Sequence, residues 1–389
     1  MTRLSRGGRS PAVVVSLALI AVALGAGSAA LGVCGPFTDV SDDAFCPFVL
    51  EIFTLGITTG TTPTTYDPSG SVTRLQMAAF LSRSVDGALR RGSRRALIKK
   101  FWTPQTSGVL GTTTLGATAD PFDVACDGKD IWTSGHDSAR VWRVRASDGR
   151  LLENWTGAGN ALGIVAAMGR ILVAGALTPG RLYRIDPSQP AGAVTTVASN
   201  LGGGPNQAAF DGFRIWTTNF DGSISVVTPL GTLPWTVTTV TTGFSNPYGI
   251  VYDGSNIWVR GQGKLLKLDS NAAVLQTVTV GAGAAYPVFD GTNIWAPDYA
   301  ANSVTVVRAS SGAVLATLTG NGLDGMSAAA FDGERVLVTN SLGDSVSLWK
   351  AGDLTALGSF QTGGYPAGAC SDGFNFWIAT LDGQRLERF

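Results

Sequence analysis

The sequence predicts a mainly β protein, a seven-bladed β-propeller over residues 105–389 with a small α-helical module at 37–86 in front of it. The main observation is a phrase that recurs seven times. Its copies are ACDGKDIW (125–132), AAMGRIL (166–172), FDGFRIW (210–216), YDGSNIW (252–258), FDGTNIW (289–295), FDGERVL (331–337) and SDGFNFW (371–377). Its Asp position falls at residues 127, 168, 211, 253, 290, 332 and 372, so that the intervals are 41, 43, 42, 37, 42 and 40 residues. A period near 40 built from short β-type segments is typical of one propeller blade.

Each repeat contains four predicted strands. In the sixth repeat these are residues 326–331, 336–340, 345–349 and 354–359, and an Asp-Gly pair separates the first two. Asp-Gly favours a tight hairpin, because both residues tolerate the positive φ that such turns need. Four strands in each of seven repeats give seven blades.

The two ends of the propeller sequence predict how the ring closes. The last repeat stops at its third strand, 384–389, and an unassigned strand at 108–116 precedes the first repeat. We expect these two strands to pair, because an unpaired edge strand promotes aggregation.

The repeated Asp and Trp have a structural interpretation. Asp forms the turn, and the Trp of the second strand packs between blades, since Leu172 and Leu337 replace it in two copies. The alternative is that the indole ring of this Trp caps a bound carbohydrate or lines a pore.

Charge is unevenly spread along the chain. Residues 1–102 hold 11 Lys+Arg and 6 Asp+Glu (net +5), which leaves 17 and 22 (net −5) for residues 103–389. An acidic propeller argues against nucleic acid as a partner.

The first 30 residues have the pattern of a signal peptide. Arg3, Arg6 and Arg9 precede an apolar run at 11–26, and Ser28-Ala29-Ala30 suits cleavage. A retained membrane anchor is the alternative.

Four cysteines fit an oxidising compartment. Cys34 and Cys46 flank one short segment and are the expected disulfide. Cys126 and Cys370 occur one and two residues before the repeat Asp, so they point to opposite faces of their strands. We favour two buried thiols here. The alternative is a disulfide, because closure of the propeller makes the blades of Cys126 and Cys370 neighbours.

The helical module carries four motifs in order: Phe-Thr-Asp-Val (37–40), Leu-Gly-Ile-Thr-Thr-Gly (55–60), Tyr-Asp-Pro (66–68) and Thr-Arg-Leu-Gln (73–76). Apolar spacing predicts a helix over 43–55 and a second helix that begins after Thr73 as its N-cap. Together the motifs resemble the S-layer homology motif. The resemblance implies non-covalent attachment to anionic cell-wall polysaccharide.

By this resemblance, Arg74 is the anion contact, and Asp39 and Gly60 belong to the same binding motif. The sequence differs from the family pattern in two ways. Leu75-Gln76 replaces the family's Ala-Glu, and only one motif is found where the family packs three. A single copy must form a trimer, pack on the propeller or act as a helical pedestal.

A basic linker, residues 87–104, joins the two parts. Six cations lie within residues 90–100. They could contact anionic polymers or lipids, although a solvated helix end is the preferred interpretation.

The propeller itself also resembles a known repeat. Residues 337–368, LVTNSLGDSVSLWKAGDLTALGSFQTGGYPAG, are similar to a YVTN-type repeat, and the Gly-His and Trp-Asp signatures of WD40 repeats are missing. This group includes surface proteins, lactonases and antibiotic lyases, so the resemblance implies the fold and leaves the function open.

Signals of catalysis are few. His136 is the only histidine, in a loop where a solvated side chain is the default, and no Gly-x-Ser-x-Gly elbow occurs. The lyase relatives use His with a divalent metal, which a single loop His matches poorly. No catalytic residue, metal site or cofactor is therefore predicted.

Binding candidates lie near the starts and ends of predicted strands, where inner strands converge on the propeller axis. The channel-lining candidates are Asp120, Asn206, Asn246, Tyr248, Tyr286, Asp324 and Tyr365, and Asp298 is a further non-repeated carboxylate.

The sequence as a whole predicts an exported protein of the bacterial cell surface. The module would attach it to cell-wall polysaccharide, and the propeller would serve as a binding or scaffold platform for a protein or small molecule. A monomer, or a trimer through the module, is expected. The alternative is a propeller enzyme of lactonase or lyase type acting in the central channel.

Overall fold

The computed structural model describes residues 34, 36–40, 45–54, 57–81, 84 and 108–389. The chain divides into two compact units, residues 1–101 and 102–389, which are described separately. The predicted signal peptide (1–30) and basic linker (87–104) lie outside the described residues. Within them, no helix is long and apolar enough to cross a membrane.

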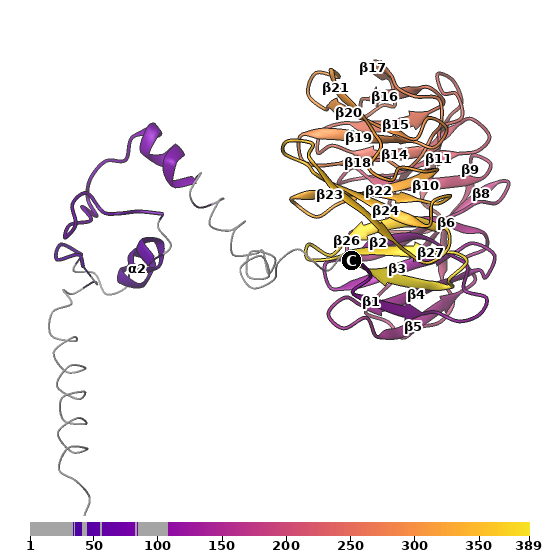
Figure 1. Ribbon diagram of the computed structural model, residues 1–389. Coiled ribbons are helices and arrows are strands. Elements are labelled where there is room, and N and C mark those ends of the chain that lie inside the picture. Colours follow the sequence, from indigo (N-terminus) through magenta and orange to yellow (C-terminus); the bar gives the residue numbers. More distant parts are fainter. Residues whose placement is uncertain (1–33, 35, 41–44, 55–56, 82–83, 85–107) are drawn as a thin grey trace, which may run out of the picture. The chain divides into compact units, whose positions relative to one another are not determined.

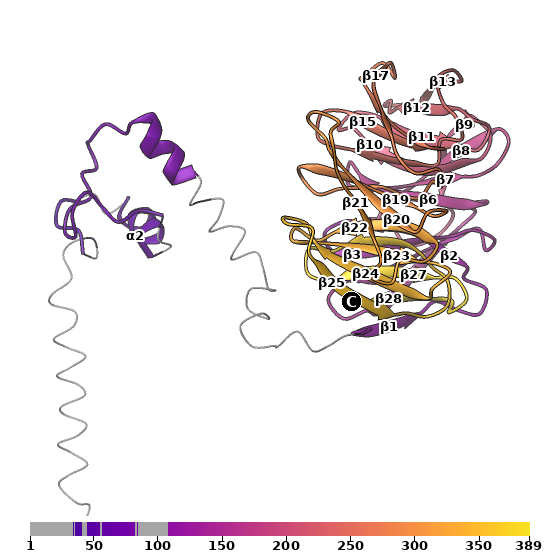
Figure 2. The ribbon, with the colours of Figure 1, turned by 45° about the horizontal axis from the view of Figure 1, so that its top comes forward.

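The second unit is a seven-bladed β-propeller, which confirms the predicted fold (Figures 1 and 2). Each blade is a four-stranded antiparallel sheet, and the first strands of neighbouring blades contact one another. From blade one to blade seven, the inner strands are β2 (Pro121–Cys126), β6 (Ala161–Ala167), β10 (Pro205–Phe210), β14 (Gly249–Tyr252), β18 (Val288–Phe289), β22 (Met326–Phe331) and β26 (Pro366–Ser371).

The other strands follow outward in each blade. The second strands are β3 (Asp130–Gly135), β7 (Arg170–Gly175), β11 (Ile215–Asn219), β15 (Ile257–Gly261), β19 (Asn293–Asp298), β23 (Arg335–Asn340) and β27 (Phe376–Thr380). The third are β4 (Arg140–Arg145), β8 (Gly180–Ile185), β12 (Ile224–Thr228), β16 (Lys264–Leu268), β20 (Ser303–Arg308), β24 (Ser345–Lys350) and β28 (Arg385–Arg388). The outermost are β5 (Leu151–Thr156), β9 (Thr195–Leu201), β13 (Thr236–Val240), β17 (Val274–Thr279), β21 (Val314–Thr319), β25 (Ala356–Gln361) and, in blade seven, β1 (Gly111–Thr114).

Blade seven is therefore built from both ends of the propeller sequence. β1 pairs antiparallel with β28, from Gly111 opposite Arg388 to Thr114 opposite Arg385. Next to β1, Leu115 is buried in a cluster that includes Trp377. The strand expected over 108–116 is thus present as the shorter β1, and it covers the edge that β28 would otherwise expose.

The repeated Asp links the turn to the buried indole. In the fifth blade, Asp290 Oδ1 accepts backbone N–H bonds from residues 292 and 293, and Oδ2 accepts the indole N–H of Trp295 at 2.7 Å. The same indole bond, at 2.7–2.8 Å, joins Asp127–Trp132, Asp211–Trp216, Asp253–Trp258 and Asp372–Trp377. A buried indole N–H needs an acceptor, so one Asp both shapes the turn and satisfies the ring.

The two blades without this Trp show why the pair occurs together. Blade two has Leu172 in place of Trp, and Met168 replaces the Asp. Blade six has Leu337, and the Asp332 carboxylate binds the guanidinium of Arg335 instead. The five Trp side chains are almost completely buried, as packing between blades requires.

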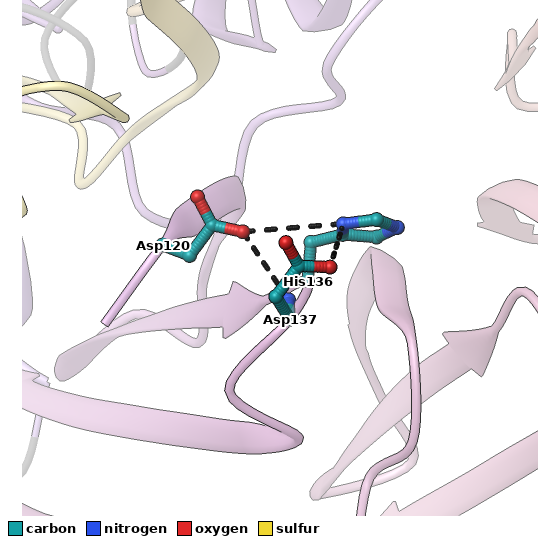
Figure 3. Close-up of side chains that lie close together, drawn as sticks. All are labelled: Asp120, His136 and Asp137. Carbon is teal, nitrogen blue, oxygen red and sulfur yellow. Dashed lines mark hydrogen bonds and ion pairs between the residues drawn. The ribbon is translucent and has the colours of Figure 1, made fainter. Parts of the chain in front are cut away.

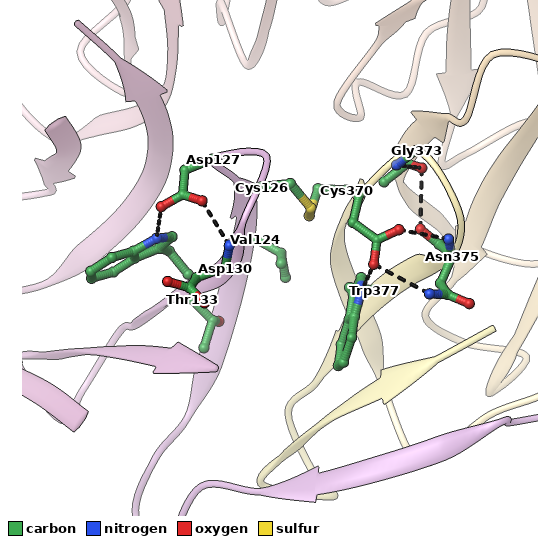
Figure 4. The surroundings of a disulfide bond; sticks show 12 residues. Val124, Cys126, Asp127, Asp130, Thr133, Cys370, Gly373, Asn375 and Trp377 are labelled. Carbon is green, nitrogen blue, oxygen red and sulfur yellow. Dashed lines mark hydrogen bonds between the residues drawn. A yellow bond between two sulfur atoms is a disulfide. The ribbon is translucent and has the colours of Figure 1, made fainter. Parts of the chain in front are cut away.

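A disulfide joins Cys126 of β2 to Cys370 of β26 (Figure 4), so the preferred interpretation of two separate thiols is wrong. The Cα atoms are 6.1 Å apart. Blades one and seven pack face to face, and facing side chains must come from the front of one sheet and the back of the other. Cysteines at adjacent offsets in the repeat point to opposite faces, and for this reason they meet across the closure.

The first unit contains the helical module. Helix α2 (Cys46–Thr54) falls within the predicted helix 43–55, whose residues 43, 44 and 55 lie outside the described residues, and residues 74–81 form a second helical segment. A disulfide joins Cys34 to Cys46. The small core of the module contains Cys34, Phe37, Val40 and Val49.

Candidate functional site

Five blades share a corner in which the residue before the inner strand contacts the residue after the second strand. In blade one, the His136 N–H donates to the Asp120 carbonyl at 3.1 Å. The equivalent bonds join Ala176 to Asn160, Phe220 to Gly204, Ser341 to Gly325, and Leu381 to Tyr365. The first residue of each corner has φ between 48° and 68°, the left-handed region. Asp120 and Tyr365, two predicted candidates, therefore occupy one repeated position.

Asn206, Tyr248 and Tyr286 come together from blades three, four and five. The Tyr286 hydroxyl donates to Asn206 Oδ1 at 2.9 Å, and Asn206 Nδ2 donates to the Tyr248 carbonyl at 2.9 Å. The two Tyr ring centroids are 5.5 Å apart. Asn206 and Tyr286 are buried, and burial raises the pKa of the Tyr286 phenol well above its ordinary value. The group links blades three, four and five, and burial keeps the Tyr286 phenol protonated.

The remaining candidates are more open. Tyr365 is 36% exposed, and Asp324 is exposed and accepts a bond from Asn302 Nδ2 at 3.5 Å. Asn246 precedes the inner strand of blade four, at φ 44°, and its amide lies 3.4 Å from Gln262 Oε1. Two exposed aromatics that sequence reasoning missed, Phe220 and Tyr299, occupy the residue after a second strand.

Asp298 is part of a buried ion pair. Its Oδ2 lies 3.5 Å from Arg260 Nη2, and both side chains are almost completely buried. Asp298 Oδ1 also accepts N–H bonds from residues 283, 300 and 301. This carboxylate therefore holds the link between blades four and five and is not open to a ligand.

Asp123 is a buried carboxyl that sequence reasoning missed. Its Oδ1 accepts the Val124 N–H at 2.9 Å and its Oδ2 accepts the Ile164 N–H of the next blade at 3.1 Å. Gln207 does the same between blades three and four, through the Ile250 N–H. Burial raises the pKa of Asp123 to about 7, against the opposing effect of the two N–H bonds. A carboxyl in an otherwise apolar inner strand was the signal in the sequence.

Replacing Asp123 by Asn is expected to flatten the dependence of stability on pH. The pKa of Asp123 in the folded state, about 7, lies above the ordinary value of 3.8. The contribution of this carboxyl to the unfolding free energy is therefore largest below pH 3.8 and is lost as the pH rises through 7. From pH 5 to 7, this group should cost the wild type about 2 kcal/mol of unfolding free energy. Urea unfolding at both pH values measures the loss, with the exposed Asp382→Asn as control. Equal pH dependence in wild type and Asp123→Asn would contradict the assignment.

Asp120, His136 and Asp137 form a group at the corner of blade one (Figure 3). His136 Nδ1 lies 2.8 Å from Asp137 Oδ1 and 3.9 Å from Asp120 Oδ2. The Asp137 N–H donates to Asp120 Oδ2 at 3.2 Å. The histidine expected to be a solvated loop residue is 38% exposed and faces two carboxylates.

Two shallow depressions lie at the other end of the inner strands, beside the Asp-Gly turns. They have volumes of about 410 and 380 Å³ and lie between blades four and five and between blades five and six. Arg308 and Thr292 line both. None of the predicted candidates lines either depression.

In the module, Asp39 and Gly60 have structural contacts. The Asp39 carboxylate accepts the N–H groups of Tyr66 and Asp67 at 2.7–3.1 Å, and the bond from Tyr66 contributes most to lowering the pKa of Asp39. Gly60 has φ 77°, and a Cβ there would lie 2.5 Å from the Phe37 ring. Asp39 ties the start of the module to the turn at residues 66–67, and Gly60 leaves room for the ring of Phe37.

Arg74 is exposed at the first turn of the second helical segment. Thr73 caps this segment, since its hydroxyl accepts the Gln76 N–H and its own N–H donates to Gln76 Oε1 at 2.8 Å. Gln76 therefore completes a capping box where the family has Glu. Within the described part of the chain, Arg74 forms no ion pair.

Comparison with known families finds one match, and it falls in the module. Residues 36–78 match the S-layer homology domain. The predicted resemblance is thus confirmed, and an S-layer homology domain implies attachment at the bacterial cell surface. No curated protein matches the chain.

The propeller is similar to several solved structures. A catalytically inactive virginiamycin B lyase from Staphylococcus aureus, in a structure with quinupristin, is 13% identical with a TM-score of 0.59, over 72% of this chain and 97% of that chain. Kuenenia stuttgartiensis hydrazine synthase is 15% identical with a TM-score of 0.61, over 72% and 98%. The WD40 propeller domain of Doa1 is 12% identical with a TM-score of 0.61, over 72% and 96%. At these identities the likeness shows the fold alone.

Proposed function

We propose that the protein is exported, that its S-layer homology module binds cell-wall polysaccharide, and that its propeller is a binding platform at the cell surface. The observation that carries the proposal is the family match at residues 36–78. The charged run and small residues of the first 30 residues support export. The corners of five blades carry different residues at equivalent positions, and this variation supplies the surface on which a ligand would be distinguished.

Arg74 is the proposed contact with the wall polymer. It is exposed, it stands in the first turn of a helical segment, and backbone N–H groups at such a turn add to the attraction for an anion. A guanidinium binds carboxylate or phosphate groups through paired hydrogen bonds. Asp39 and Gly60 would act indirectly, because they hold the fold of the module.

The module also exposes apolar side chains to an unusual extent for its size. Leu75 is 85% exposed, and Phe45, Phe48 and Leu81 are each exposed by about 60%. A module of this size buries little apolar surface by itself, so association is a usual source of additional stability. We therefore favour association through the module over a monomer, and a trimer is the form that the resemblance to the S-layer homology family suggests.

Retention on purified cell wall tests the attachment. Wild-type protein should sediment with the wall, and Arg74→Ala should release most of it because the anion contact is lost. Arg150→Ala, an exposed arginine of the propeller, is the matched control and should remain bound. Wild-type protein that washes off freely would reject wall attachment, and equal retention of both variants would reject Arg74 as the contact.

The alternative function is an enzyme of lactonase or lyase type. One observation favours it, the placement of the only imidazole of the chain beside two carboxylates at the start of an inner strand. Asn206 and Tyr286 are buried and bonded to each other, and Tyr248 is half-buried beside them, so these candidates offer little open surface for a reaction. We therefore favour a binding platform over an enzyme.

A further inference from the structure

The atoms of Asp120, His136 and Asp137 lie at distances suited to a shared cation. One ligand atom from each residue lies within 4.8 Å of the others, and the His136 imidazole is 2.8 and 3.9 Å from the two carboxylates. Ligands bound at about 2.1 Å to one transition metal are separated by roughly 3–4 Å. The side chains therefore need little rearrangement to bind together (Figure 3).

Backbone hydrogen bonds fix the places of Asp120 and His136 in the fold. The corner of blade one is held by the His136 N–H bond to the Asp120 carbonyl, and Asp120 N–H donates to Gln384 Oε1 at 2.7 Å. The other four corners of this kind combine residues that cannot make a site of the same type. These are Asn160 with Ala176, Gly204 with Phe220, Gly325 with Ser341, and Tyr365 with Leu381. Only the corner of blade one combines a carboxylate with an imidazole.

The group also carries uncompensated negative charge. Within the described residues, neither Asp120 nor Asp137 pairs with a lysine or arginine, and His136 is the partner of both. Asp221, which follows the second strand of blade three as Asp137 does in blade one, instead accepts bonds from Ser223 and the Gly203 N–H. A divalent cation would balance the charges of the two carboxylates.

We propose that Asp120, His136 and Asp137 bind a divalent transition metal, with Zn²⁺ as the reference ion. Imidazole nitrogen favours Zn²⁺ and similar ions over Mg²⁺ and Ca²⁺, and the two carboxylates supply the charge. Three protein ligands leave further coordination positions free, and Asp137 is 80% exposed, so those positions face solvent. The metal site does not depend on wall attachment.

The test is calorimetric titration of the full chain, free of any histidine tag, after removal of metal by a chelator. We expect one saturable Zn²⁺ site in the wild type, bound more tightly than Mg²⁺. His136→Ala and Asp120→Asn should each weaken Zn²⁺ binding by at least about tenfold, since loss of a direct ligand should exceed the effect of losing an outer partner. Asp382→Asn is the matched control, because Asp382 follows the second strand of blade seven without a neighbouring imidazole, and it should bind as the wild type does.

A second readout uses the single histidine. The imidazole proton resonances of the wild type, which belong to His136 alone, should shift or broaden on addition of one equivalent of Zn²⁺. Circular dichroism establishes that each variant is folded, and the exposed Asp137→Asn replaces any variant that is not. Absence of saturable binding, unchanged affinity in the ligand variants, unaffected imidazole resonances or tighter binding of Mg²⁺ would each overturn the proposal.

Discussion

Deletion of residues 105–116 is expected to produce insoluble protein. The deletion removes β1, and β28 would then present a row of unpaired N–H and C=O groups over Arg385–Arg388. It also removes Leu115, which is buried in the same apolar cluster as Trp377 and Leu386. The disulfide between Cys126 and Cys370 would still join blades one and seven, but it lies at the inner strands and does not cover this outer edge.

The measurement is the soluble fraction after expression, followed by thermal unfolding of whatever remains soluble. A deletion of equal length in the linker, residues 87–98, is the control and should leave a soluble propeller. A soluble 105–116 deletion product with one cooperative unfolding transition would show that blade seven does not need β1.

The Arg260→Ala substitution is expected to lower the unfolding free energy by about 3–5 kcal/mol. Arg260 is fully buried and donates to the Gly281 carbonyl at 2.7 Å and to the Gly283 and Gly261 carbonyls. Burial lowers the pKa of Arg260 to about 10, and the nearby Asp298 opposes that shift. Removing the guanidinium leaves Asp298 Oδ2 and several carbonyls buried without this donor, whereas Asp298 Oδ1 keeps its three backbone N–H bonds.

Denaturant unfolding measures this loss, with the exposed Arg150→Ala as a control that should change stability by less than about 0.5 kcal/mol. The Arg260→Ala/Asp298→Ala double variant should be less destabilised than the sum of the single variants, because neither charge is then left unpaired. A loss below about 1 kcal/mol for Arg260→Ala would mean that the blade four–five link is held by other contacts.

The architecture was predictable because it depends on a period and on local turn chemistry. Asp290 and Trp295 repeat in most blades, and neither their spacing nor their role needs long-range information. The interaction between them, a hydrogen bond from indole to carboxylate, follows only once the turn brings the two side chains together. The position of the closing strand was also open to prediction, since one repeat visibly lacked its last strand.

The contents of the centre were harder to predict, because they depend on which side chains meet between blades. Asn206 and Tyr286 are 80 residues apart and satisfy each other in the core, although both are typical ligand-binding residues. Asp123 acts as a buried acceptor for the next blade, a role that Gln207 performs two blades later. The prediction for Cys126 and Cys370 was wrong because it assumed that the two side chains must point to the same face of their sheets. A bridge between two packed sheets instead joins opposite faces.

The position of β1 has a mechanical consequence. β1 is the first described strand after the linker, so a pull transmitted from the module would load β1 before any other part of the propeller. Its backbone pairs with a strand on one side only, β28, and Thr113 adds a side-chain bond to the Gly149 carbonyl of blade one at 2.6 Å, so these few contacts would break when the strand is pulled from the edge. The covalent link between β2 and β26 lies inward of that edge, so the ring would stay closed while the released strand lengthens the tether by about 3.3 Å per residue. Under tension the protein would thereby yield at β1 before the ring of blades opens.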